Sequence, residues 1–460
     1  MFKHRILLAI FNGQGQINPS FQFAKRVIAM GARVTIPIVA SLHRRIANKS
    51  PISGLSLVPF SDGHDDGFNP NKTTHADFAL YASQLHQRAS DFVSHLILSA
   101  ASDGDPFTCL LYTLLVPWAP PLARRFNLPT AMLWVEPATV LNIIYHYFHG
   151  YADHINHASK TTAIVFPGFS FSLSPRDMPS MLLHRESGIS SFFYSLFEEQ
   201  IQQLDLERNL LVLVNTFEAL EEEALRAVDK LNMIPIGPLV PSAILDGKDP
   251  RDTSFGGDLL PVSSHYLEWL DSKQENSVVY VSFGSYWELS KRQMEEIADA
   301  LLDCERPFLW VIRRKVVEDG KEEDDISCRE ELEKKGKIVT GGSVPCFCGL
   351  FRDALWLELH HGRTCLRVPM VAFPQFTDQM TNAKLIEDVW KVGVRVEDED
   401  DDGIVEGKEI KRCMEVVMGN GDKGNELRRN AEKWKVEARE AAIEGGSSEK
   451  NLKAFLDGVA

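Results

Sequence analysis

Hydrogen-bonding side chains follow two apolar runs in the second half of the chain. Gly284 and Ser285 come directly after the run Ser277–Phe283. A serine hydroxyl at such a point can donate to a phosphate oxygen, because glycine lets the backbone approach closely. The same pair is also a common turn at the end of a strand. Further along, Asp378 precedes a helical pattern over Gln379–Val389, where its carboxylate is suited to cap the helix.

Two pairs of potential metal ligands have spacings that argue against a metal site. His360 and His361 are adjacent, and the side chains of adjacent residues point apart in a regular element. Cys346 and Cys348 are separated by a single residue, closer than the usual CxxC pair. The seven cysteines show neither disulfide nor zinc spacing. The sequence therefore predicts no metal and a reduced, cytoplasmic setting.

Length and charge narrow the class of protein. A chain of 460 residues is too long for one typical core, so two domains are expected. The net charge of -15 argues against a nucleic-acid partner, because a nucleic-acid surface needs positive charge. The first apolar run, Ile6–Phe11, is too short for a signal peptide or a membrane span.

The alternation of apolar runs and amphipathic stretches predicts an α/β fold. Arg5–Phe11 is a continuous apolar run typical of a buried parallel strand. Asn18 and Pro19 then predict the start of an amphipathic helix, and Ala32–Val39 the next strand, which together form a right-handed crossover unit. Further strands are predicted at Thr108–Tyr112, Thr130–Val135, Leu210–Asn215, Met233–Ile236, Ser277–Phe283, Phe308–Ile312 and Met370–Phe373, and helices at Lys291–Cys304, Glu426–Ile443 and Glu449–Leu456.

A segment rich in Pro, Gly, Asp and Ser, Pro238–Gly257, predicts a linker between two such domains. We expect an N-terminal domain over 1–240, a linker over 241–260, a C-terminal domain over 261–440 and a last helix within 441–460. Two open α/β sheets bind ligands at the carboxyl ends of their strands, which predicts a cleft without selecting a substrate.

Several segments resemble plant family 1 UDP-dependent glycosyltransferases along the whole chain. They are Val214–Leu220, Ile236–Leu239, Val279–Ser285, Arg306–Arg313 and Val368–Trp390. Three more are similar to a branch that contains anthocyanin 5-O-glucosyltransferases and enzymes forming glucose esters of plant acids, namely Ser61–Gly67, Trp134–Ala138 and Pro241–Gly247. The resemblance implies a GT-B fold, two Rossmann-like parallel-sheet domains facing across a cleft. Residues 1–240 would then bind the acceptor, 261–440 the UDP-sugar, and the helix in 441–460 would pack back on the N-terminal domain.

The resemblance also implies a reaction, an inverting displacement at C1 of the sugar. In this family a histidine after the first strand removes the proton of the acceptor hydroxyl, because a neutral hydroxyl is a poor nucleophile. Gln16 stands at that position, and a glutamine amide cannot take the proton. An ordinary turn residue is the alternative interpretation of Gln16. The nearest match to the aspartate that often supports the histidine is Thr113.

The remaining site residues follow from the same resemblance. Gly284 and Ser285 would donate to the diphosphate, and Asp378 and Gln379 match the pair that hydrogen-bonds sugar hydroxyls. In the acceptor domain, Trp134 and Glu136 are candidates for the acceptor pocket; core packing explains Trp134 equally well.

One segment departs from the family. From about Thr340 to Arg367 the first half of the donor-binding box is absent. One permitted set of codons for Arg352–Gly362, read from the second base, encodes VTHCGWNSTME, and HCGWNS is the centre of the missing half. We hypothesise that this half exists in another reading frame. If 340–367 is translated as it stands, the chain lacks the tryptophan that stacks on uracil, the Asn and Ser that bind phosphate and the glutamate that binds ribose, and we expect disorder or rearrangement there.

Taken together, the sequence predicts a UDP-glucose-dependent O-glucosyltransferase of an anthocyanin- or flavonoid-like plant molecule. UDP-glucose would be its co-substrate, and no cofactor is implied. The first alternative is a catalytically inactive relative, because both Gln16 and residues 340–367 depart from the family. The second is a generic two-domain nucleotide-binding protein such as an epimerase, which the lack of a GxGxxG fingerprint after the first strand disfavours.

Overall fold

The computed structural model describes residues 4–46, 52–68, 75–183, 188–207, 210–245, 247, 249, 252, 265–274, 276–283, 289–312, 326–340, 354–357, 368–398 and 403–459. They divide into two compact units. Met1–Val240 and Glu440–Ala460 belong to the N-terminal unit, and Leu260–Arg439 to the C-terminal unit. Within the predicted linker, the short helix α10 (Ser242–Leu245) groups with the C-terminal unit.

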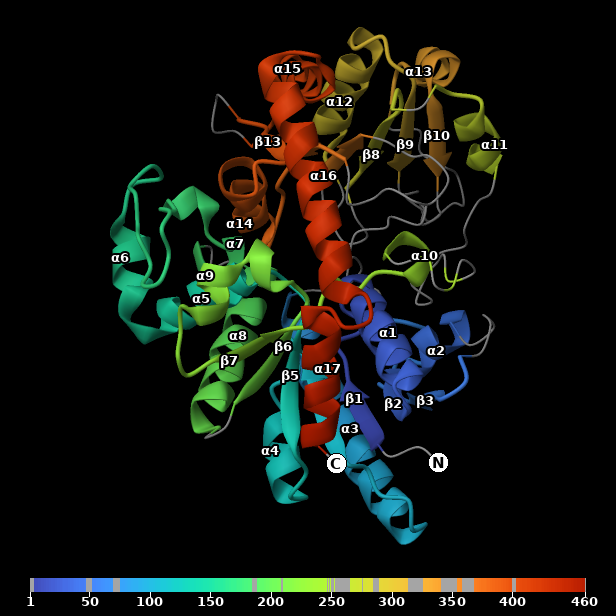
Figure 1. The fold of residues 1–460 in the computed structure, drawn as a ribbon, viewed down its shortest axis with the longest axis vertical. Helices are drawn as coiled ribbons and strands as arrows, with labels where there is room; N and C mark the ends of the chain where they lie inside the picture. Colours follow the sequence, from blue (N-terminus) through green and yellow to red (C-terminus); the bar gives the residue numbers. More distant parts are fainter. Residues whose placement is uncertain are drawn as a thin grey trace. The chain divides into compact units, whose positions relative to one another are not determined.

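The N-terminal unit is built on a parallel sheet of seven strands in the order β3-β2-β1-β4-β5-β6-β7 (Figure 1). The strands are β1 (His4–Ala9), β2 (Ala32–Val39), β3 (Leu55–Phe60), β4 (Cys109–Thr113), β5 (Thr130–Trp134), β6 (Leu211–Val214) and β7 (Asn232–Pro235). The helices are α1 (Gln14–Ala29), α2 (Ala40–Ile46), α3 (His75–Ser102), α4 (Ala119–Arg125), α5 (Ala138–His146), α6 (Ala152–His157), α7 (Ser180–Leu183), α8 (Gly188–Leu206), α9 (Glu222–Arg226) and α17 (Ser447–Gly458).

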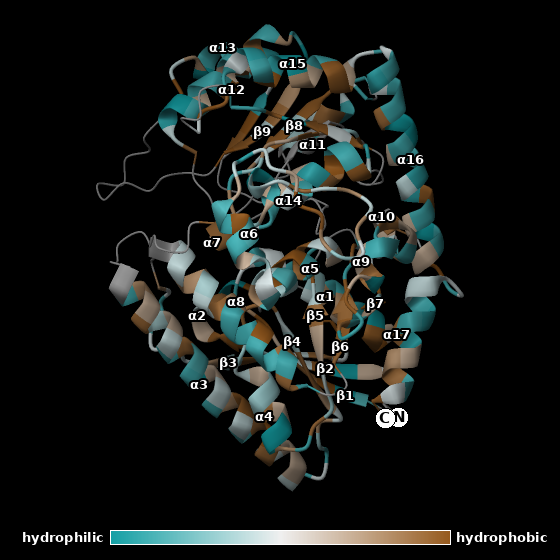
Figure 2. Ribbon diagram, turned by 90° about the vertical axis from the view of Figure 1, so that its left-hand side faces the viewer, coloured by the Kyte–Doolittle hydropathy of each residue, from teal (hydrophilic) through white to brown (hydrophobic). Residues whose placement is uncertain are grey.

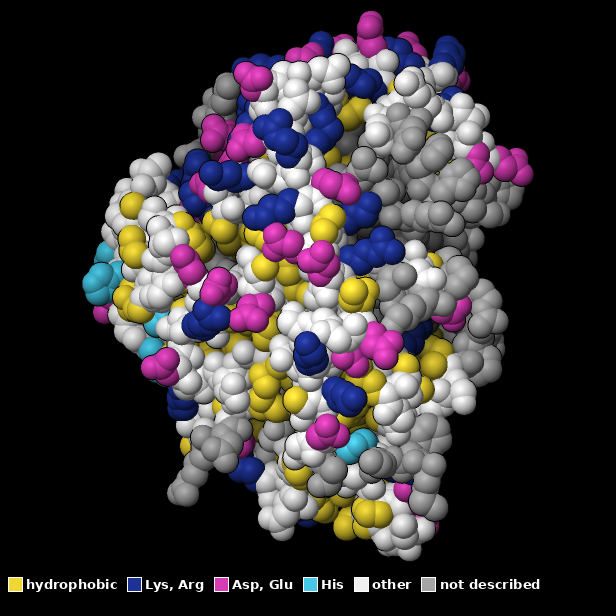
Figure 3. All heavy atoms as spheres, viewed as in Figure 1, with side chains coloured by type: hydrophobic (Ala, Val, Ile, Leu, Met, Phe, Trp, Pro, Cys, Tyr) yellow, Lys and Arg dark blue, Asp and Glu magenta, His cyan; other side chains and the backbone are white. Residues whose placement is uncertain are grey.

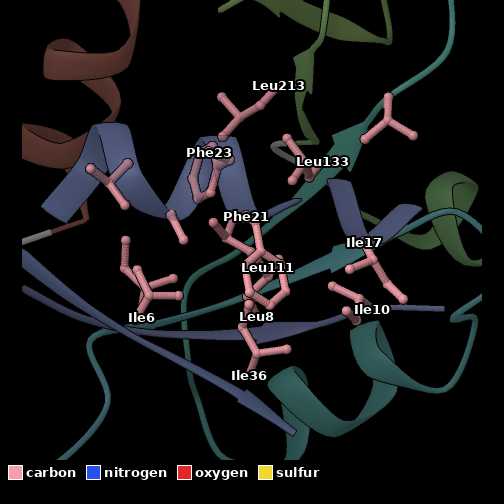
Figure 4. Close-up of a cluster of buried hydrophobic side chains, with 14 of the residues drawn as sticks. Ile6, Leu8, Ile10, Ile17, Phe21, Phe23, Ile36, Leu111, Leu133 and Leu213 are labelled. Atoms are coloured by element: carbon pink, nitrogen blue, oxygen red, sulfur yellow. The ribbon is translucent and has the colours of Figure 1, made fainter. Parts of the chain in front are cut away.

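Apolar side chains from the strands and from α1 form the core of this unit. Phe21 and Phe23 of α1 lie in one cluster with Leu8 and Leu111 of the central strands β1 and β4 (Figure 4), and all four are at most 2% exposed. Burying a large apolar side chain contributes about 1.5–3 kcal/mol. This packing fixes α1 on the sheet and so fixes the loop that joins β1 to α1.

The start of α1 differs from the prediction. The helix begins at Gln14, four residues before Asn18, and Pro19 lies inside it. Pro19 has no N–H to donate to the preceding turn, which weakens the helix there. The packing of Phe21 and Phe23 outweighs this loss, and the Ser20 hydroxyl adds a hydrogen bond to the Gln16 carbonyl at 2.6 Å.

The C-terminal helix α17 belongs to the same unit. Leu452, Phe455 and Leu456 lie in its hydrophobic core and are at most 4% exposed. The Asn451 side-chain amide also donates to the Pro235 carbonyl of β7 at 2.9 Å. The two ends of the chain therefore contribute to one core.

The C-terminal unit contains a six-stranded sheet in the order β10-β9-β8-β11-β12-β13. Its strands are β8 (Val279–Ser282), β9 (Phe308–Ile312), β10 (Lys337–Thr340), β11 (Ala354–Leu357), β12 (Met370–Ala372) and β13 (Gly393–Arg395). Its longer helices are α11 (His265–Asp271), α12 (Lys291–Asp303), α13 (Arg329–Lys335), α14 (Gln379–Lys384), α15 (Gly407–Met418) and α16 (Asp422–Ala442). A π-helical turn, Leu385–Val389, continues α14. Figure 2 shows β8 and β9 in hydrophobic colours and α16 as mostly hydrophilic.

Strand β11 is an exception to the parallel pairing of this sheet. It pairs antiparallel with both neighbours, β8 and β12, whereas the other pairs are parallel. β11 lies within the segment 340–367, where the sequence analysis predicts a departure from the family pattern. Apart from Thr340 and β11, that segment lies outside the described residues.

The surface agrees with the acidic but mixed composition. On the face drawn in Figure 3, Lys and Arg side chains alternate with Asp and Glu, and neither sign forms a continuous field. Within the described part of the chain, no helix is both long enough and apolar enough to cross a membrane.

Candidate active site

The turn after β1 places Gln16 in the first turn of α1. Its backbone N–H donates to the Gly13 carbonyl at 2.9 Å, and the residue is only 8% exposed. Gln16 Oε1 is buried and has no hydrogen-bond partner among the described residues. A buried polar atom in this state is ready to accept a hydrogen bond from a ligand, although the amide cannot remove a proton near neutral pH.

Thr113 joins the carboxyl ends of β1 and β4. Its Oγ1 accepts the backbone N–H of Phe11 at 3.1 Å and donates to the Leu114 carbonyl at 3.3 Å. The side chain is completely buried. Its hydroxyl is thus used by the backbone and carries no charge that could support a basic partner.

A pocket opens at the carboxyl ends of these strands. Its space, including the part open to solvent, is about 360 Å³. The lining includes Phe11 and Asn12 after β1, His86 of α3, and Leu115 and Trp118 after β4. The site is where an open parallel sheet is expected to bind a ligand. Sequence patterns did not single out His86, because one histidine on a long amphipathic helix carries no motif.

Trp134 and Glu136 lie elsewhere in the N-terminal unit. Trp134 is 1% exposed at the end of β5, and its indole N–H donates to the Pro137 carbonyl at 2.9 Å. Neither residue belongs to the lining of the pocket beside β1. In the structure Trp134 therefore packs in the core and holds the turn that contains Glu136.

Glu221 supports this turn, and the sequence did not reveal it. Its carboxylate accepts the backbone N–H groups of Ala138 and Thr139, each at 3.0 Å, and the Thr139 hydroxyl at 2.8 Å. These are N–H groups that the first turn of α5 cannot satisfy by itself. Burial raises the pKa of Glu221, and the hydrogen bonds to Thr139 and Ala138 oppose that rise. In the sequence, the signal that could have pointed to Glu221 is its place directly after Val214–Leu220, one of the segments that resemble the family.

On the donor side, Gly284 and Ser285 lie outside the described residues. Asp378 occupies the N-cap position of α14, but its side chain does not cap the helix. Its Oδ2 accepts the Asn382 side-chain amide at 2.8 Å, and its Oδ1 accepts the Thr377 hydroxyl at 2.7 Å. The predicted cap is therefore wrong, because neighbouring side chains occupy both carboxylate oxygens.

Gln379 holds the turn before α14. Its Oε1 accepts the backbone N–H groups of Gln375 at 2.6 Å and Phe376 at 3.1 Å. With the oxygen used in this way, the Nε2 group is the part of the side chain suited to donate to a ligand hydroxyl. Thr377 in the same turn has φ of 60°, an uncommon conformation for a residue with a side chain. Such strain clusters at binding sites.

The potential metal ligands give no site in the described structure. Within the described ranges, no group of three His, Cys, Asp or Glu side chains is arranged to hold a metal ion. Cys346, Cys348, His360 and His361 lie outside those ranges.

Comparison with known proteins identifies the family. No protein-family model matches the chain. The chain is 50% identical to a phloretin 4'-O-glucosyltransferase of Malus domestica, with 100% of this chain and 98% of the relative covered. It is 46% identical to an anthocyanidin 3-O-glucoside 5-O-glucosyltransferase of Verbena hybrida, over 100% of this chain and 99% of the relative. The chain belongs to the plant family 1 UDP-glycosyltransferases.

Solved structures agree with this assignment. Os79 from O. sativa, in complex with UDP, superposes with a TM-score of 0.82 at 28% identity and covers 99% of this chain and 100% of its own. Another Os79 structure also contains a trichothecene. This UDP-glycosyltransferase therefore has the GT-B fold, and solved members bind UDP and a small-molecule acceptor.

The alignment with the Malus relative also bears on the departing segment. It spans 487 positions, whereas this UDP-glycosyltransferase has 460 residues. The chain therefore lacks residues that the relative has.

Proposed function

We propose that this chain transfers glucose from UDP-glucose to a phenolic hydroxyl of a flavonoid-like plant molecule. The observation that carries the proposal is the 50% identity, over the whole chain, to a phloretin 4'-O-glucosyltransferase. Similarity to anthocyanidin 5-O-glucosyltransferases from Verbena hybrida and Perilla frutescens supports the same acceptor class.

The described residues suggest how the reaction is divided between the units. The acceptor hydroxyl would release its proton to water as its oxygen attacks C1 of glucose, the bond from C1 to the UDP oxygen would break, and UDP would leave with the electron pair. The family position of the base holds Gln16, whose unpartnered Oε1 can orient the hydroxyl. In the C-terminal unit, Gln379 Nε2 would donate to a hydroxyl of glucose, and Asp378 would hold the adjoining turn through Thr377 and Asn382.

The test is a transfer assay with purified protein. UDP-glucose is offered with phloretin or with an anthocyanidin 3-O-glucoside, and products are identified by mass spectrometry. We expect a monoglucoside of one of the two acceptors and one UDP released for each glucoside. The absence of any glucoside at high enzyme concentration, with the protein shown to be folded, would contradict the proposal.

The competing proposal is a non-catalytic relative that binds an acceptor without transferring sugar. It is favoured by Gln16, which offers no basic group at the turn after β1. The two proposals differ in one measurement. The active enzyme releases UDP in the presence of an acceptor, whereas the non-catalytic relative binds acceptor and releases none.

The location of this protein in the cell is also proposed from its sequence. We propose the cytoplasm, which is consistent with the scattered cysteines of the sequence. One relative, 48% identical, is a crocetin glucosyltransferase named as chloroplastic, so imaging of a tagged full-length chain is the appropriate test.

A further inference from the structure

Three departures from ordinary helix geometry occur together at the start of α14. Asp378 occupies the N-cap position, but its side chain forms no hydrogen bond to the N–H groups of the helix. Thr377 has φ of 60°, an uncommon conformation for a residue with a branched side chain. The Oδ1 atom of Asn382 is buried and has no hydrogen-bond partner among the described residues. Each feature lowers stability, and such features in one short turn indicate a functional constraint.

The same three residues form one hydrogen-bonded group around the Asp378 carboxylate. Its Oδ1 accepts the Thr377 hydroxyl at 2.7 Å, and its Oδ2 accepts the Asn382 side-chain amide at 2.8 Å. The Asn382 backbone N–H also donates to the Asp378 carbonyl at 2.9 Å, which fixes the two residues one helical turn apart. These contacts hold the carboxylate in one orientation before any ligand arrives.

The carboxylate keeps hydrogen-bonding capacity for a ligand. Its two oxygens have about four acceptor sites, and Thr377 and Asn382 use one on each oxygen. Asp378 is only partly buried, so the remaining sites are within reach of a ligand. The next residue, Gln379, uses its Oε1 for backbone N–H groups of the turn, which leaves Nε2 to donate. Adjacent residues therefore present acceptors and a donor, the groups that recognise neighbouring hydroxyls.

We propose that Asn382 is a positioning residue for the sugar of the donor, and that it acts by holding the Asp378 carboxylate. Its amide N–H performs this task, whereas its oxygen has no partner, so the side chain contributes little to folding stability. The inference rests on the proposed function and on the match of Asp378 and Gln379 to the family pair that hydrogen-bonds sugar hydroxyls. It assigns a role to a residue of α14 that lies beyond that pair.

The experiment measures UDP-glucose and UDP binding to the full-length protein by calorimetry at pH 7.5, without an acceptor. The ratio of the two dissociation constants isolates the contribution of the sugar. Asn382→Leu keeps nearly the same shape and removes the amide. It should bind UDP-glucose about tenfold more weakly and UDP with unchanged affinity, because a carboxylate that is no longer held recognises the sugar less well. Its thermal stability should be unchanged or higher, because the unpartnered oxygen is removed and water reaches Asp378.

A double-mutant cycle tests whether Asn382 acts through Asp378. In an Asp378→Ala background, Asn382→Leu should cause no further loss of UDP-glucose affinity, because the carboxylate that Asn382 holds is gone. The matched control is Lys384→Met, which removes the ion-pair partner of Asp388 from the same helix. It should leave both affinities unchanged, as expected for an exposed ion pair.

Equal UDP-glucose affinity in the unchanged protein and Asn382→Leu would overturn the proposal. So would additive losses in the cycle, which would show that Asn382 contacts the sugar directly, or an equal loss for UDP, which would show a wider structural effect. Glucosyl transfer that is as efficient in Asn382→Leu as in the unchanged protein would contradict this proposal alone. The expected binding pattern without any glucoside formed would contradict the proposed function alone. No UDP-glucose binding by the unchanged protein would contradict both.

Discussion

At the scale of single residues, the backbone fixes the position of Gln16, whereas its side chain decides whether a proton can be removed there. Gln16 is buried in the first turn of α1 and is held by its backbone bond to Gly13, so its place does not depend on its side chain. What the side chain lacks is basicity, since an amide cannot act as a general base near neutral pH. Under the proposed function, this position is therefore one where the backbone is in place and the basic group is missing.

Gln16→His should raise kcat for glucosyl transfer by about 10²–10⁴-fold if the donor side is intact, the usual contribution of a general base. The rate should acquire a pH dependence near the ordinary histidine pKa of about 6.5, falling as the ring becomes protonated. Steady-state kinetics from pH 5 to 9 measure both effects. Gln14→His, in the same helical turn, is the control and should leave the rate unchanged. An unchanged rate in Gln16→His would place the defect elsewhere.

Glu221→Gln should destabilise the N-terminal unit by about 1–3 kcal/mol, because an NH₂ group would replace an oxygen that accepts N–H groups of α5. Denaturant unfolding measures the change. Glu222→Gln, an exposed neighbour paired with Arg226, should change stability by less than about 0.5 kcal/mol. Equal effects of the two substitutions would contradict the capping role.

Because the pKa of Glu221 is raised, the difference in stability between Glu221→Gln and the unchanged protein should depend on pH. Burial raises its folded-state pKa above the ordinary value of 4.5. Between the unfolded and the folded pKa, the folded state binds more protons, so this carboxyl makes stability fall as the pH rises through that window. Glu221→Gln cannot titrate, and its stability should lack this contribution. A stability curve parallel to that of the unchanged protein above pH 4.5 would argue against a raised pKa.

At the scale of elements, strands formed by continuous apolar runs were predicted well, and strands without such a run were not. Ala32–Val39 and Phe308–Ile312 form strands with the predicted bounds. β3 was missed because its burial is partial and it contains Pro59, a residue that sheets accept at their edges. β13 was missed because Gly393–Arg395 contains a glycine and an arginine and so is not an apolar run. Such strands depend on their neighbours for stability.

The antiparallel strand β11 also depends on its neighbours in the sheet. Its position between β8 and β12 must be filled, because two buried strands would otherwise lose their backbone partners. Ala354–Leu357 is a short apolar run that fills it in the antiparallel direction. The sequence therefore predicted a departure from the family at 340–367. The sheet determined that Ala354–Leu357 of this segment pairs with β8 and β12 as a strand.

Replacing Arg352–Gly362 by VTHCGWNSTME should strengthen UDP binding by at least about 100-fold, because each charge-assisted hydrogen bond to the nucleotide contributes about 1.5–3 kcal/mol. Calorimetric titration of UDP measures the change, with a scrambled version of the same peptide as control. Sequencing the transcript across these codons would show which frame is translated. Equal UDP affinity in all three proteins would contradict the reading-frame hypothesis.

At the scale of the whole molecule, the last helix completes the first core. Phe455 is 4% exposed in a cluster that also contains Ile6 and Leu8 of β1. Sequence separation is no barrier to this packing, because a core gains its free energy from buried area and not from order along the chain. The N-terminal unit is therefore incomplete without residues near 450.

Phe455→Ala should destabilise the N-terminal unit by about 3–5 kcal/mol, the usual effect of removing a buried aromatic side chain. Lys453→Ala, at an exposed position of the same helix, should change stability by less than about 0.5 kcal/mol. Denaturant unfolding monitored by circular dichroism makes the comparison. Similar stabilities of the two variants would show that α17 is not part of this core.

The sequence by itself determined the family, the α/β class and most central strands, because motifs and apolar runs are local features of the chain. It also predicted departures from the family at Gln16 and at 340–367. Tertiary structure decided which distant residues share a site. It brought His86 of α3 to the pocket beside Asn12, and Glu221 to the first turn of α5. It also directed the carboxylate of Asp378 to Thr377 and Asn382 in place of the helix end. Contacts of this kind depend on burial and on competing partners, which exist only once the chain has folded.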